Sequence, residues 1–197
     1  MKGILTLTLL LMLCFISCNN NPQKKAGKDS TEARKKGMDH MDDFSVKFAT
    51  DAAISNLKEI ELGKLAEKNA NYSRVKEFAA KMVTAHTKAN AALGQVRYSS
   101  DVTLPSALSE NDQKHIADFA DKKGPAFDKA YMMEMVDAHQ KILEMLDKAA
   151  SRLKDSSLKK YAVTMQQEVT AHLDEARNIL EDVRKQYRPE QGPDVSH

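Results

Sequence analysis

Four long segments between Asp42 and Tyr187 repeat apolar residues three and four positions apart, and no sustained alternation of apolar and polar residues competes with this spacing. Glycine and proline are rare inside these segments, whereas alanine, leucine, methionine, lysine and glutamate, which favour helices, are common. Such a chain has to bury one stripe of each helix against other helices. The sequence therefore predicts an all-α domain over residues 42–187, which is one domain in size.

The turns and proline residues divide this domain into two hairpins. NANYS and KDSS make the tight turns, and Pro105 interrupts the helical pattern between the hairpins. Ser109 is a suitable N-cap for a short helix within the connector Ser99–Gly124. We predict long helices over about 43–69, 73–98, 125–153 and 157–187, with the short helix reaching 121. The connector is long enough to span the domain, as in a ferritin-like up-down four-helix bundle.

The two predicted hairpins resemble each other. VKEFAAKM (Val75–Met82) and LKKYAVTM (Leu158–Met165) share three identical residues, and each directly follows a hairpin turn. The equal position relative to the turn indicates two related helical hairpins.

The first residues indicate export. Residues 1–17 contain one lysine and an apolar run that is too short to cross about 30 Å of hydrocarbon, and this is typical of a signal peptide. The stretch from Phe15 to Cys18 resembles a bacterial lipobox, which predicts lipidation of Cys18; an ordinary cleaved signal is the alternative. We expect an envelope lipoprotein that faces the periplasm and is held to a membrane by its lipid.

Polar, lysine-rich residues 18–41 predict a disordered tether, and residues 188–197 a disordered tail. The net charge of +2 is too small to favour nucleic acid as a partner, and the domain has no patch of basic and aromatic residues.

Three of the six histidines end nearly the same pentapeptide: MVTAH at His86, MVDAH at His139 and EVTAH at His172. Each of them interrupts the apolar stripe of its helix, as do Glu59 and Glu168. Counted from the turns at 1.5 Å per residue, all five positions fall near the middle of their helices. Since an unpartnered buried polar group costs about 1–3 kcal/mol, these side chains should meet in one cluster.

The occupant of this cluster is open at this point. The candidate ions are copper, zinc and iron. His86, His139 and His172 are candidate imidazole ligands, and Glu59 and Glu168 are candidate carboxylate ligands. Met82 and Met135 would add thioethers, which favour copper over iron. A di-iron site normally uses two Glu-x-x-His pairs, and the chain has none. The alternatives are a structural or partner-binding bundle with a metal-free polar core, a metal-dependent oxidase or detoxifying enzyme, and a haem or small-molecule pocket.

Four stretches are similar to a bacterial family, domain of unknown function 4142: ELGKLAEKNA (61–70), VKEFAAKMVTAHTKAN (75–90) with Leu104-Pro105, FDKAYMMEMVDAH (127–139) and AHLDEA (171–176). The resemblance covers residues 42–183 and implies an exported protein with a ferritin-like fold, without an activity or catalytic residues. Members often carry aspartate directly before the second-helix histidine, where this chain has Ala85. We therefore expect a binding or stress-related protein rather than an enzyme.

Overall fold

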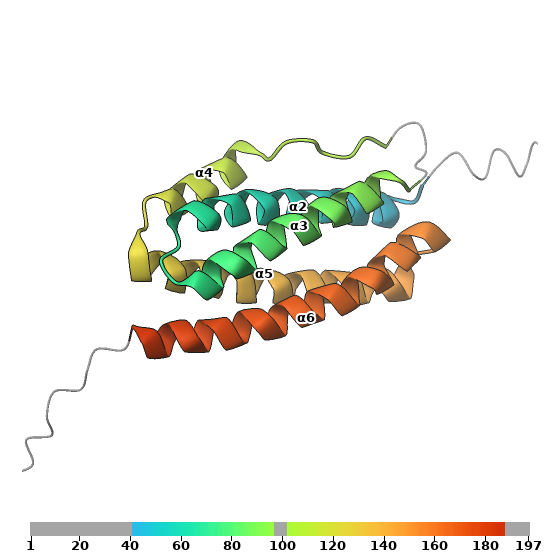
Figure 1. The fold of residues 1–197 in the computed structure, drawn as a ribbon. Coiled ribbons are helices and arrows are strands. Elements are labelled where there is room, and N and C mark those ends of the chain that lie inside the picture. Colours follow the sequence, from blue (N-terminus) through green and yellow to red (C-terminus); the bar gives the residue numbers. More distant parts are fainter. Residues whose placement is uncertain (1–40, 97–101, 188–197) are drawn as a thin grey trace, which may run out of the picture. The chain divides into compact units, whose positions relative to one another are not determined.

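The computed structural model describes residues 41–96 and 102–187, and it confirms that this part of the chain is all-helical. Its elements are α2 (Asp43–Asn69), α3 (Ser73–Gly94), α4 (Glu110–Ala120), α5 (Gly124–Arg152) and α6 (Ser156–Gln186) (Figure 1). The predicted helices agree with these bounds, except that α3 ends at Gly94 instead of near residue 98.

Several predictions concern residues outside those that the structure describes: the signal peptide, lipidation at Cys18, nearly all of the tether, and the tail. Within the described ranges, no helix is both long enough and apolar enough to cross a membrane.

Short-range signals explain where the helices begin. The side chains of Asp42, Ser109 and Asp155 accept hydrogen bonds from backbone N–H groups in the first turns of α2, α4 and α6. The N-cap predicted at Ser109 is thus confirmed. Pro125 stands in the first turn of α5, and Gly124 takes a positive φ of 56°, a conformation that glycine adopts without strain.

Helices α2 and α3 form one hairpin and α5 and α6 another, and α4 lies against α2 and α5 (Figure 1). The carboxylate of Asp128 at the start of α5 accepts hydrogen bonds of 2.9 Å from the backbone N–H groups of Asn71 and Tyr72 in the α2–α3 turn. The hydroxyl of Tyr187, just after α6, donates to the same carboxylate. Helices α3 and α5 therefore both start at the end of the domain that carries the α2–α3 turn, and they run in the same direction. The expected up-down alternation holds within each hairpin, but not between α3 and α5, which the connector joins.

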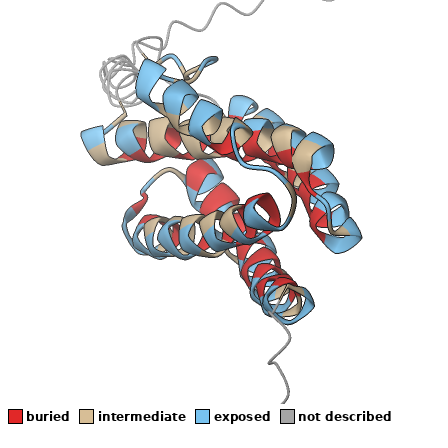
Figure 2. Cartoon of the chain, turned by 90° about the vertical axis from the view of Figure 1, so that its left-hand side faces the viewer, coloured by how far each residue is buried: buried red, intermediate tan, exposed pale blue. Residues whose placement is uncertain are grey.

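Buried residues line the inward faces of the helices (Figure 2) and form two apolar clusters. One lies toward the α2–α3 turn and includes Phe78, Phe127 and Ile179; the other lies toward the α5–α6 turn and includes Phe48 and Leu158. The buried polar side chains of the middle of the helices belong to neither cluster. In the described residues, the polar layer expected at mid-height therefore lies between the two apolar clusters.

Candidate metal centre

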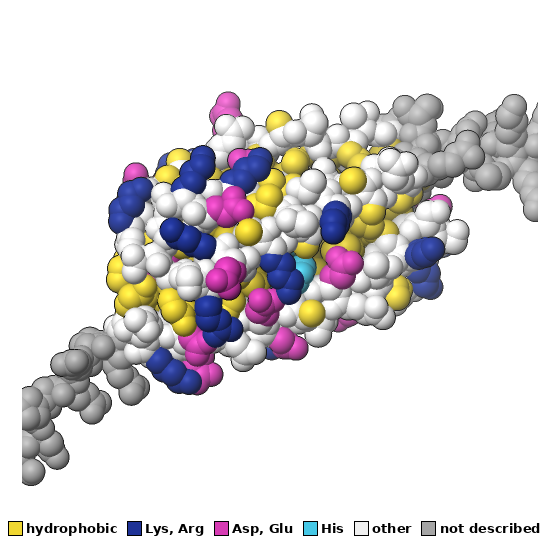
Figure 3. Space-filling model, in the orientation of Figure 1, with side chains coloured by type: hydrophobic (Ala, Val, Ile, Leu, Met, Phe, Trp, Pro, Cys, Tyr) yellow, Lys and Arg dark blue, Asp and Glu magenta, His cyan; other side chains and the backbone are white. Residues whose placement is uncertain are grey.

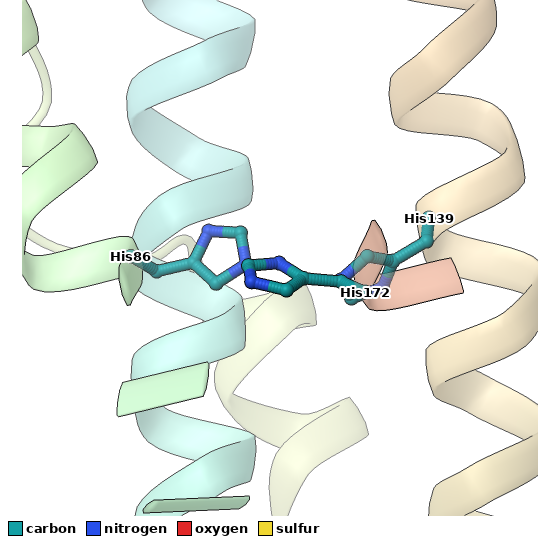
Figure 4. Close-up of side chains that lie close together, drawn as sticks. All are labelled: His86, His139 and His172. Atoms are coloured by element: carbon teal, nitrogen blue, oxygen red, sulfur yellow. The ribbon is translucent and has the colours of Figure 1, made fainter. Parts of the chain in front are cut away.

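The three histidines that end the repeated pentapeptides converge. Their ring centroids are 5.9 Å apart for His86–His139, 5.9 Å for His86–His172 and 5.6 Å for His139–His172. They reach this point from α3, α5 and α6 (Figure 4), and one ring nitrogen of each lies within 4.8 Å of the other two. The convergence that the sequence predicted for these residues is present.

His86 is oriented by a short chain of hydrogen bonds. Its Nδ1 lies 3.0 Å from Oδ1 of Asn56, whose Nδ2 donates to the hydroxyl of Tyr161 at 3.1 Å. With the amide oxygen accepting, Nδ1 of neutral His86 carries the proton and Nε2 keeps its lone pair. Nε2 is buried and has no hydrogen-bond partner.

His139 is held in the same tautomer by the backbone. Its Nδ1 donates to the carbonyl oxygen of Met135 at 2.8 Å. A carbonyl can only accept, so the proton is on Nδ1 and Nε2 is again left as a buried, unpartnered lone pair. The ring has no exposed surface.

His172 completes the set with Nδ1, which is buried and without a partner. Three orphaned imidazole nitrogens in one interior are costly, at about 1–3 kcal/mol each. A tetrahedral ion with Zn–N bonds of about 2.0–2.1 Å holds its ligand nitrogens about 3.3 Å apart. One ring nitrogen of each histidine lies within 4.8 Å of the other two, so the rings are already near that spacing.

The surroundings keep the imidazoles neutral. Burial lowers the pKa of His86 to about 3, and the neighbouring His139 and His172 add to the effect. Burial also lowers the pKa of His139 and of His172 to about 4, from an ordinary 6.5. Neutral imidazole is the form that binds metal, so at pH 7 these rings need to release no proton to do so.

Glu59 is buried next to the cluster but is not one of its converging groups. Its Oε1 lies 3.8 Å from Nδ1 of His139, too far for a hydrogen bond, and its Oε2 has no partner. It faces the ring nitrogen of His139 that carries the proton, not the one that is free. Burial, and secondarily the charge of Glu134, raises the pKa of Glu59 to about 8.

Glu168 does not join the cluster, because its side chain is exposed on the surface of α6. The core position next to it is taken by Val169, which is fully buried. The first residues of MVTAH and MVDAH, Met82 and Met135, are buried, whereas the first residue of EVTAH is exposed. Helix α6 is therefore rotated about its axis relative to the orientation that the shared pentapeptide predicted. Both methionines belong to the apolar cluster beside the polar layer, and the group of converging ligand atoms in the described residues consists of the three histidines.

Asn56 was not among the side chains that the sequence pattern predicted for the polar layer. It is 4% exposed, lies three positions before Glu59, and supplies the oxygen that faces His86. That spacing placed it on the inward face of α2, although the adjacent Ser55 fits the apolar stripe equally well. Asn56 thus gives His86 a hydrogen-bond partner, although Ala85 stands where family members often carry aspartate.

The profile of a family described as a domain of unknown function, DUF4142, matches residues 30–179. A solved protein of Streptomyces coelicolor, named as secreted and as DUF305, is similar with a TM-score of 0.58 and 12% identity, over 71% of this chain and 92% of that chain. At this identity the likeness concerns the fold alone. The search among curated proteins finds no significant match.

Proposed function

The chain belongs to the DUF4142 family, a domain of unknown function, and we propose that its buried histidines bind a single transition-metal ion. The observation that carries the proposal is the convergence of three neutral, buried imidazoles whose free nitrogens have no other partner. A metal-free polar layer would be expected to pair these atoms with one another.

The donor set favours zinc or copper. Imidazole suits both ions, and three histidines leave the fourth position of a tetrahedral site open. The backbone carbonyl of Met135 accepts the hydrogen bond from Nδ1 of His139 and so orients that ring with Nε2 free, the role that a carbonyl or carboxylate commonly has for metal-bound histidine. We therefore assign the three histidines to coordination, and Glu59, 3.8 Å from the same Nδ1, to the surroundings of the site.

Metal content after purification without chelator tests this proposal. We expect about one zinc or copper ion per chain by mass spectrometry, either as purified or after adding the ion, and none in the variant His139→Leu/His172→Leu. His115→Leu is the matched control, because His115 lies on α4 and pairs with Glu134, outside the cluster. If neither copper, zinc nor iron binds stoichiometrically, the site is a metal-free polar layer.

We further propose that the domain is a ferritin-like four-helix bundle in an envelope lipoprotein. Four long helices with a crossing connector support this fold type. Export is supported by the signal-like residues 1–17 and by the naming of the Streptomyces coelicolor neighbour as secreted. The role is binding of the ion in the envelope rather than turnover, with the lipid on Cys18 as the membrane partner.

Lipidation is tested by growing bacteria that express the protein with radiolabelled palmitate. We expect label on the wild-type protein and none on Cys18→Ser. Cys14→Ser is the matched control, since Cys14 lies inside the apolar run and should not affect labelling. Equal labelling of Cys18→Ser would show that Cys18 carries no lipid.

A further inference from the structure

A large groove runs between α3 and α6 and borders the cluster of histidines at His172. Its volume is about 1080 Å³, slightly above the range of about 300–1,000 Å³ that is usual for small-molecule sites. It follows α3 from Ala80 to Ala92, a length of roughly 18 Å at 1.5 Å per residue. The face that carries α3 and α6 is drawn in Figure 3, where apolar side chains lie between charged ones and one histidine is visible.

The lining of the groove combines small apolar residues with amines. Ala85, Ala89 and Ala92 from α3 and Met165 from α6 provide apolar surface. The lining has three lysines, Lys81, Lys88 and Lys160, against one carboxylate, that of Glu168. Lys81 also pairs with Glu175. A long, mostly apolar surface with excess positive charge is complementary to a linear hydrocarbon chain with an anionic head.

Two lining residues connect the groove to the polar layer. His172 lines the groove and belongs to the cluster. Tyr161 also lines it, and its hydroxyl accepts from Asn56, which contacts His86. A ligand in the groove would therefore contact His172, one of the three histidines of the cluster.

From this geometry we propose that the α3–α6 groove binds a long-chain carboxylate, a ligand of the fatty-acid class. The alkyl chain lies along the alanines of α3, and the carboxylate is attracted by the lysines. This site goes beyond the proposed metal binding and does not depend on it, because apolar contact and lysine charge are present without an ion.

Titration of metal-free protein with a dansyl-labelled fatty acid, followed by displacement with dodecanoate, tests the proposal. We expect saturable fluorescence enhancement and full displacement by dodecanoate. Dodecyltrimethylammonium has the same alkyl chain and the opposite charge, and it should compete at least about tenfold less well. An equal effect of both amphiphiles, or no saturable binding of the probe, overturns the proposal.

Neighbouring residues provide matched variants. Ala92→Trp fills the groove and should weaken binding at least about tenfold, whereas Ala91→Trp, exposed on the same helix but outside the groove, should not. Lys160→Glu should weaken dodecanoate binding about threefold or more, and Lys159→Glu should have no such effect. Circular dichroism checks that each variant is folded. Equal losses within either pair would place the binding elsewhere and refute the groove.

Discussion

Replacing His139 and His172 together by leucine is expected to make the metal-free protein more stable, by about 2–4 kcal/mol in urea unfolding. Both histidines have a buried ring nitrogen without a partner, and leucine of similar volume removes that cost. The hydrogen-bonded chain from His86 through Asn56 to Tyr161 is left intact in this variant. A stability gain from deleting polar residues is the sign of a site that is kept for binding.

Metal ions should reverse this order. At a concentration of about 1,000 times the dissociation constant, a bound ion stabilises the wild-type protein by about 4 kcal/mol, while the double leucine variant gains nothing. Asn56→Leu is the contrasting polar-to-apolar change, and it should destabilise the metal-free protein because it leaves His86 Nδ1 and the Tyr161 hydroxyl without partners. A double leucine variant that is markedly less stable than wild type without metal would mean that the imidazoles hold the fold together.

The helices and the level of the site were predictable because both follow from spacing along a single helix. Apolar periodicity gave the element bounds, and counting from the turns put His86, His139 and His172 at one height. Contacts with neighbouring helices set the rotation of each helix about its axis. An apolar stripe with steps of three and four residues defines the inward-facing positions only to within about one residue. This is why Glu168 was expected inside and Val169 occupies that place.

Partners across the interior depend on contacts between helices, which the sequence pattern does not contain. Asn56 and Tyr161 are 105 positions apart, and nothing local to either residue indicates their hydrogen bond. The direction of α5 relative to α3 was likewise fixed by Asp128 contacting the α2–α3 turn. The groove could not be predicted for the same reason: it results from the distance between α3 and α6 and from the small side chains on both helices.

The stability of the metal-free protein is expected to fall steeply below pH 6.5. The unfolded chain binds protons on the three histidines near their ordinary pKa of 6.5, whereas the folded pKa values are about 3 to 4, so acid favours unfolding. Glu59 acts in the opposite sense, because its pKa of about 8 lets the folded protein hold one proton that the unfolded chain loses above 4.5. Between about pH 4.5 and 6.5 the unfolded chain holds three histidine protons and the folded protein holds one proton on Glu59. This difference of two protons makes the free energy of unfolding rise by about 2.7 kcal/mol per pH unit.

Above pH 6.5 the histidine contribution is constant, and Glu59 alone sets the direction. Its raised pKa means that stability is lost as the pH rises toward 8, by about 1.4 kcal/mol per unit, so that the optimum lies near pH 6.5. Urea unfolding at a series of pH values, compared with Glu59→Gln and with the double leucine variant, separates the two effects. The glutamine variant should lose the alkaline decline, and the leucine variant should lose two of the three protons in the acid limb. A wild-type profile that is flat from pH 5 to 8 would show that these side chains are hydrated in the folded state, because only their burial sets the folded pKa values apart from the unfolded ones.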